Sequence, residues 1–223
     1  MTFNYKDKEY NYPNSLKDIT LKQRIELHVQ YGISFEEKAK KIAEIEDITK
    51  RAIEEAELKL LFACQCFSFF TTIPLEEIKS DFDITQIMNV YNTSLSLVLS
   101  EEAEIEIQPT YDFAGDTWAI SSPEINTRSK ITFNEFITSK EVVRQLEQLG
   151  KGKWQSLLYL CAIYFRKEHE EFKEELLDDG GERMALMLTL PMDIALAVGF
   201  FLTNSMSLYL NTLLSSNEEE EGE

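Results

Sequence analysis

The chain has 223 residues, of which 43% are hydrophobic and 28% are charged, a composition typical of a globular protein that can bury its own core. Its formal net charge is −18, with 22 Lys and Arg residues against 40 Asp and Glu residues. This balance opposes binding to a phosphate backbone or an anionic membrane surface. We therefore expect no nucleic acid partner and no membrane partner.

The N-terminal part predicts a β-hairpin and a short helix. Aromatic and polar residues alternate through residues 3–12 on both sides of Asp7, which places Asp7 in the turn of a hairpin. Thr20 and Gln23 form a capping-box pattern, and Gly32 supplies a stop signal. These signals predict a short helix that begins after Thr20 and ends at Gly32.

A long, charged helix is predicted next. Ser34 and Glu37 form a second capping-box pattern, and apolar residues recur every three or four positions through residues 35–60. On the other face, acidic residues precede basic residues by four positions, and each such pair stabilises a helix by about 0.2–0.5 kcal/mol. Residues 58–70 are apolar on all sides, so we expect this end to enter the core or a partner before Pro74.

The central part predicts a shorter helix over residues 84–99 and a small antiparallel strand pair. Residues 103–108 alternate Glu with apolar residues, and residues 111–120 carry Gly115-Asp116 between apolar residues. Residues 121–130 are polar and predict a linker. The predicted N-terminal region, residues 1–120, therefore holds the hairpin, the long charged helix and the central strands.

The predicted C-terminal helical interaction region covers residues 131–214. Capping-box patterns at residues 132–135 and 138–141 predict helix starts, the second helix ending at Gly150. A helix from Trp154 is expected to continue through the acidic segment to Asp178. Pro191 then opens a final apolar helix. The whole chain thus predicts an α+β, predominantly helical fold with a disordered acidic tail at residues 215–223.

The cysteines and the chain start favour a cytosolic protein. Cys64, Cys66 and Cys161 stand inside apolar runs, where we expect reduced core thiols. The first residues lack a signal segment. Residues 192–214 have the length of a membrane span, but polar residues interrupt them and no basic residue follows, so we expect no span.

Few residues suggest catalysis. His28 and His169 are distant in sequence, and the carboxylates near His169 point to other helix faces, so no metal site or other cofactor is expected. Gly150-Lys-Gly-Lys153 lacks the spacing of a phosphate loop and predicts a turn. Asp112, Asp116 and Glu124 leave open a small carboxylate-dependent hydrolase.

Two groups of residues are candidates for partner binding. The aromatic and apolar candidates are Trp154, Tyr164, Phe165, Phe172, Phe200, Phe201, Tyr209 and Leu213. The acidic candidates are Glu170, Glu171, Glu174 and Glu175. An acidic strip beside aromatic residues favours docking of a basic amphipathic partner. The alternatives are core packing for the first group and a solvated helix face for the second.

The C-terminal block resembles morphogenesis proteins of tailed bacteriophages, most closely tail assembly chaperones. The resemblance rests on Phe133-Asn-Glu-Phe-Ile137, on Trp154 with Leu157-Leu-Tyr-Leu-Cys-Ala-Ile-Tyr-Phe-Arg166, and on Glu182-Arg183 followed by Leu190-Pro-Met-Asp-Ile-Ala-Leu-Ala-Val-Gly-Phe-Phe201. The N-terminal hairpin running into Tyr12-Pro-Asn-Ser-Leu-Lys-Asp-Ile-Thr-Leu21 is similar in character.

This resemblance implies a non-enzymatic protein without cofactors, made in the cytoplasm of a bacterial host. It implies binding to a hydrophobic virion component, such as a tape-measure protein, within a homo- or hetero-oligomer of phage structural proteins. The central strands and the long helix exceed a minimal chaperone. A structural virion component, such as a portal or tail adaptor ring or an encapsidated cargo protein, is therefore the alternative.

Overall fold

The structure is a computed structural model that describes residues 1–100, 105–121, 131–167 and 170–202. The fold is α+β and mainly helical, as predicted. Its contacts divide the chain into two compact units: unit 1 consists of Met1–Ile19 and Gln23–Glu104, and unit 2 of Thr20–Lys22 and Ile105–Glu223. This division precedes the predicted linker. Ser121 is completely buried, and residues 122–130 lie outside the described residues.

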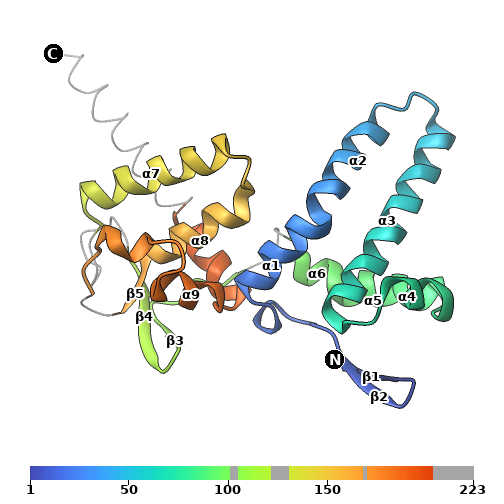
Figure 1. The fold of residues 1–223 in the computed structure, drawn as a ribbon, viewed down its shortest axis with the longest axis horizontal. Helices are drawn as coiled ribbons and strands as arrows, with labels where there is room; N and C mark the ends of the chain where they lie inside the picture. The colour runs from blue at the N-terminus through green and yellow to red at the C-terminus, as the bar shows by residue number, and fades with distance from the viewer. Residues whose placement is uncertain (101–104, 122–130, 168–169, 203–223) are drawn as a thin grey trace. The chain divides into compact units, whose positions relative to one another are not determined.

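Unit 1 begins with the predicted hairpin of β1 (Thr2–Tyr5) and β2 (Lys8–Asn11), which pair antiparallel (Figure 1). Lys6 and Asp7 form the turn with positive φ angles of 47° and 60°. Two successive positive φ angles are typical of the tight turn whose twist matches that of the strands. Asp7 therefore lies in the turn, and the prediction of the hairpin is confirmed.

The helix after the hairpin continues through Gly32, contrary to prediction. A 3₁₀ turn (Leu16–Asp18) comes first. Helix α1 (Leu21–Leu27), a π-helical turn (His28–Gly32) and α2 (Ile33–Ala43) then follow one another without a break. Gly32 has a helical φ of −62°, so it is no stop, and Ser34 lies inside the helix rather than at its start. A Cβ at Gly32 would lie 2.6 Å from His28 Nδ1, so the glycine makes room for that ring.

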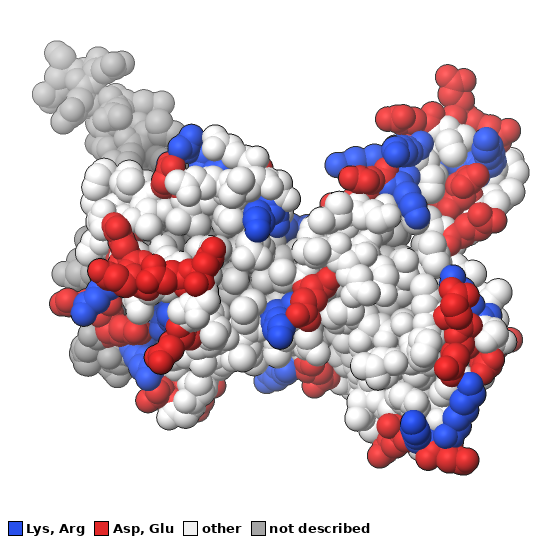
Figure 2. All heavy atoms as spheres, viewed as in Figure 1, with Lys and Arg blue, Asp and Glu red and all other residues white. Residues whose placement is uncertain are grey.

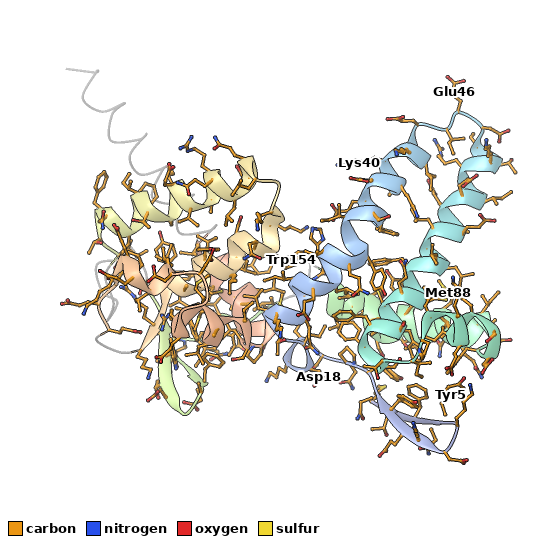
Figure 3. The ribbon with its side chains drawn as sticks, viewed as in Figure 1. Tyr5, Asp18, Lys40, Glu46, Met88 and Trp154 are labelled. Carbon is orange, nitrogen blue, oxygen red and sulfur yellow. The ribbon has the colours of Figure 1, made fainter. Side chains whose placement is uncertain are left out.

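The predicted long helix is two antiparallel helices. The chain turns after Glu44, and Asp47 begins α3 (Ile48–Thr71) by accepting a hydrogen bond from the Lys50 amide at 2.9 Å. This cap competes with the continuous helix that the apolar spacing suggested. The rings of Phe35 and Phe62 stack across the pair at 4.4 Å. Figure 3 shows Glu46 at the connection between α2 and α3.

The apolar end of α3 enters the core of unit 1, as expected. Ala63, Cys64, Cys66 and Phe67 are buried there, and the helix ends at Thr72 with a φ of 62°. The short helix α4 (Leu75–Asp81) follows and was not predicted. The predicted helix over residues 84–99 is present as α5 (Ile84–Val90), a π-helical turn (Tyr91–Leu95) and α6 (Ser96–Leu99).

Unit 2 contains a three-stranded antiparallel sheet in the order β3, β4, β5. The hairpin of β3 (Tyr111–Phe113) and β4 (Asp116–Ile120) supplies an antiparallel strand pair within the predicted strand region of residues 103–108 and 111–120. Residues 105–108 form no strand, and residues 103–104 lie outside the described residues. The third strand, β5 (Phe165–Lys167), pairs with β4 and places Phe165 opposite Ile120.

Strand β5 overturns the prediction that one helix continues from Trp154 to Asp178. Helix α8 (Gly152–Tyr164) ends where the chain joins the sheet, and the described part of the acidic segment contains only a 3₁₀ turn (Glu174–Leu177). The edge of β4 supplies backbone partners that a helix would not use. The acidic segment therefore presents no continuous helix face.

The other helices of unit 2 follow the sequence signals. Helix α7 (Phe133–Gln148) begins with the capping box of Thr132 and Glu135, while the second predicted cap lies within the same helix. Gly150, in the turn before α8, and Gly152, the first residue of α8, have positive φ angles. Helix α9 (Glu182–Leu188) leads to a final apolar helix, Met192–Leu202. Residues 203–223, which include the predicted tail, lie outside the described residues.

Within the described ranges, no single helix is long and apolar enough to cross a membrane. Helices α3 and α4 meet the length and composition criteria only as a pair, and that pair is bent by 118°.

Candidate functional site

An open apolar groove in unit 1 is the candidate functional site. Its volume is about 250 Å³, and its lining comes from α3, α4, α5 and the residue between the last two helices. The lining side chains are Glu57, Leu60, Leu61, Cys64, Ile78, Lys79, Phe82, Ile84 and Ile87. Pockets for small molecules typically hold about 300–1,000 Å³ and enclose most of the ligand. The smaller, open groove is better suited to a few side chains presented by another protein.

The sequence builds the groove from a helical stripe and a helix break. Leu60, Leu61 and Cys64 lie on one face of α3, because residues three or four positions apart are neighbours on a helix. Asp83 separates α4 from α5 by accepting a hydrogen bond from the Thr85 amide at 2.7 Å. Two short helices therefore face the stripe from α3.

The groove has a buried floor and an exposed wall. Cys64, Ile78 and Ile87 are 8%, 1% and 3% exposed, whereas Ile84 is 61% exposed. Contiguous exposed apolar surface, including a binding groove, is typical of an interaction site, whereas apolar residues scattered singly over a surface are normal. Figure 2 shows that charged side chains of unit 1 gather at the tip of α2 and α3 and along the right-hand edge down to the β-hairpin, beside a broad uncharged area in the middle of that face.

Phe82 connects the groove to the N-terminal hairpin. The Phe82 side chain lines the groove. The centroid of its ring lies 4.7 Å from the ring centroid of Tyr5 and 5.6 Å from that of Phe67. Phe3 packs on Phe67 at 5.3 Å. The hairpin therefore packs against a ring that lines the groove, and Figure 3 shows Tyr5 on this hairpin.

A polar cluster holds the hairpin turn against α4. The Tyr5 hydroxyl donates to Asp81 at 2.6 Å, and Lys6 Nζ lies 2.8 Å from Glu77 and 3.1 Å from Asp81. Hydrogen bonds from Ser80, Tyr5 and Lys6 lower the pKa of Asp81 to about 2, and the hydrogen bond from Lys6 lowers the pKa of Glu77. Both carboxylates are therefore ionised at neutral pH and are engaged in holding the hairpin.

The cysteines are core residues, as predicted. Cys66 and Cys161 are completely buried, and Cys64 reaches the groove with 8% exposure. Burial raises the pKa of all three thiols, that of Cys66 to about 12. They are therefore protonated at neutral pH, which disfavours nucleophilic chemistry.

Three of the predicted aromatic partner residues lie in the core of unit 2. Trp154 is 4% exposed, and Tyr164 and Phe165 are completely buried, so the alternative of core packing holds for these three. Phe172 and Phe201 are half-buried, and Phe200 is 37% exposed. Tyr209 and Leu213 lie outside the described residues.

The four residues of the predicted acidic strip differ in their exposure and contacts. Glu170 turns inward, where it accepts hydrogen bonds from the Lys167 amide at 3.1 Å and from Arg183 at 3.3 Å. Glu171, Glu174 and Glu175 are exposed, the last two in the 3₁₀ turn. Glu170 is therefore half-buried, with 28% of its side chain exposed, and is engaged by Arg183, whereas the other three are exposed.

Two buried arginines organise the polar interior of unit 2. Arg166 pairs with Glu135 at 2.6 Å and donates to the Ser121 hydroxyl, and all three residues are buried. Arg183 donates to the carbonyls of Ala162 and Phe165 and lies 4.7 Å from the Trp118 ring centroid. These contacts link α7, α8 and α9 to the sheet of β4 and β5.

The structure describes two of the three carboxylates of the hydrolase alternative, Asp112 and Asp116. Asp116 forms an ion pair with Lys167 at 2.5 Å, and Asp112 is exposed on β3. Glu124 and His169 lie outside the described residues. Within the described ranges, no group of His, Cys, Asp and Glu residues is placed to hold a metal ion, and His28 lies 3.7 Å from Glu36.

Comparisons with family models, curated proteins and solved structures found no match to this chain.

The groove itself was not predicted from the sequence. The available signal was the apolar stretch at residues 58–70, which was expected to enter the core or a partner. In the structure this stretch enters the core of unit 1. The opposite wall comes from α4 and α5, and α4 had no recognised start signal.

Proposed function

We propose that this chain is a non-enzymatic protein-binding protein that acts in the assembly of tailed phage particles, in the manner of a tail assembly chaperone. The observation that carries the proposal is the open apolar groove of unit 1, with its buried floor and its exposed wall at Ile84. A protein that binds the apolar side chains of an unassembled partner needs such a surface.

Two further features support a binding role over catalysis. The thiols are protonated, and the ionised Glu77 and Asp81 are engaged in holding the hairpin. The large net charge of −18 keeps copies of the protein apart in solution, which suits a protein that carries an exposed apolar groove. The resemblance of the sequence to phage morphogenesis proteins supplies the biological setting of the proposal.

The test is site-specific cross-linking in the cells that make the protein. A photoreactive amino acid replaces Ile84 in the full-length chain, and mass spectrometry identifies the attached proteins. Leu97 on α6 is the matched control, because it is 63% exposed but does not line the groove. We expect a virion component to be attached at Ile84 and not at Leu97. Equal products from both positions would contradict the proposal.

Mass spectrometry of purified particles distinguishes the two forms of the proposal. A chaperone releases its partner and is absent from the particles. A ring or cargo protein stays in them at a fixed copy number.

A further inference from the structure

We infer that the groove takes a basic amphipathic helix, and that Glu57 is the acidic contact that selects it. This inference rests on the proposed function, because it assumes that the groove is the partner site. It adds the shape and the charge of the partner.

The shape follows from the three helices that form the groove. Apolar side chains come from α3 on one wall and from Phe82 and α5 on the other, over a floor that includes Ile78 and Ile87. An amphipathic helix presents apolar side chains at i, i+3 or i+4, and i+7 along one stripe, which is the pattern that such grooves accept. A volume of about 250 Å³ is small enough for a few such anchors to fill it.

The charge follows from the two ionisable residues of the lining. Lys79 is neutralised within the protein, because its Nζ lies 3.0 Å from Glu76. In the described part of the chain, no ion pair engages Glu57. A partner helix therefore meets one uncompensated negative charge at the groove.

A basic helix is favoured over a second copy of this chain by the same charge. Two copies would each bring a net charge of −18. Lys or Arg residues beside the apolar stripe of a helix would instead be attracted during approach and would pair with Glu57 when bound.

The probe is a fluorescent synthetic helix with Leu at i, i+4 and i+7 and Lys on both sides of that stripe. Anisotropy should show saturable binding to the full-length protein. Ile84→Glu should weaken binding at least tenfold, whereas Leu97→Glu, at a position of similar exposure on α6, should leave it unchanged. Glu57→Lys should weaken binding several-fold. Glu55→Lys should not, because residues two positions apart on α3 point to different faces.

Cys64 provides a second readout that places the peptide in the groove. It is 8% exposed and lines the groove, while Cys66 and Cys161 are completely buried. The bound peptide should slow alkylation of Cys64 by iodoacetamide, measured by peptide mass spectrometry. Unchanged alkylation at saturating peptide would mean that the peptide binds elsewhere and would overturn the inference.

Other outcomes separate this inference from the proposed function. Equal binding of a peptide with Glu in place of Lys would overturn the charge assignment, and equal binding of a scrambled peptide would overturn the helix. Self-association that Ile84→Glu abolishes in sedimentation would assign the groove to a second copy.

If no peptide binds while Ile84 still cross-links to a virion component, this inference fails and the proposed function stands. If the peptide binds but the cross-link is absent, the proposed function fails.

Discussion

At the scale of single residues, the charged side chains of this protein differ in how far they are buried. Glu57 is exposed at the groove, whereas Glu135 and Arg166 are 2% and 3% exposed. A buried ion pair contributes little compared with apolar packing, but removing one partner leaves an uncompensated charge. The pair is therefore a sensitive point in unit 2.

Arg166→Met should destabilise unit 2 by about 3–5 kcal/mol, because Glu135 would remain buried without its cation. Urea unfolding followed by tryptophan fluorescence measures this loss, since both tryptophans, Trp118 and Trp154, lie in unit 2. The double variant Glu135→Gln/Arg166→Met should lose clearly less, because no buried charge remains. Equal losses in the single and double variants would show that packing, rather than charge, dominates.

Gly32 illustrates a different constraint, that of space. Gly32→Ala places a Cβ against the His28 ring, and overpacking of this kind typically costs about 1–3 kcal/mol. Hydrogen exchange of the α1 to α2 segment should become faster in the variant. Adding His28→Ala should restore the slow exchange, because it removes the clash. If the double variant exchanges as fast as the single one, the ring is not the cause.

Single elements show how far the sequence predicts this fold. The β1 to β2 hairpin and the capping box of α7 depend on neighbouring residues, and both were predicted. Strand β5 was predicted as helix because Phe165 continues the apolar run of α8 and charged residues follow it. Its backbone partners come from β4, where Ile120 lies opposite Phe165, 45 positions along the chain. The break at Asp47 was missed because the apolar spacing of α2 continues into α3.

The attachment of the hairpin to α4 should weaken in acid. The pKa of Asp81 lies at about 2, below its ordinary value of 3.8, so its contribution to stability is complete above about pH 4 and is lost as the pH falls through 2. The NMR shifts of the Tyr5 ring should follow this loss. Asp81→Asn should show altered shifts already at neutral pH. Asp7→Asn, in the exposed turn, should behave as the wild type.

At the scale of the whole molecule, the candidate site depends on residues that the chain brings together from three helices. The sequence indicated that residues 58–70 meet either core or partner, but their spacing carries no information about which side chains of α4 and α5 face them. The aromatic residues around Trp154 were candidates for partner binding because they stand beside dense acid, with core packing as the alternative. In the structure, α8 is buried among other elements of unit 2.

The net charge of −18 should act on the rate at which a basic helix arrives. Reversing Glu171, Glu174 and Glu175 to Lys should lower the association rate of the basic peptide at about 0.01 M salt, where the Debye length is about 30 Å. The difference should fade near 0.15 M, where that length is about 8 Å. Stopped-flow anisotropy measures both rate constants. The dissociation rate should stay unchanged, because these residues do not line the groove. Glu57→Lys should instead raise the dissociation rate at both salt concentrations, because Glu57 contacts the bound helix. A triple variant with a faster dissociation rate would place the binding surface on unit 2 and not in the groove.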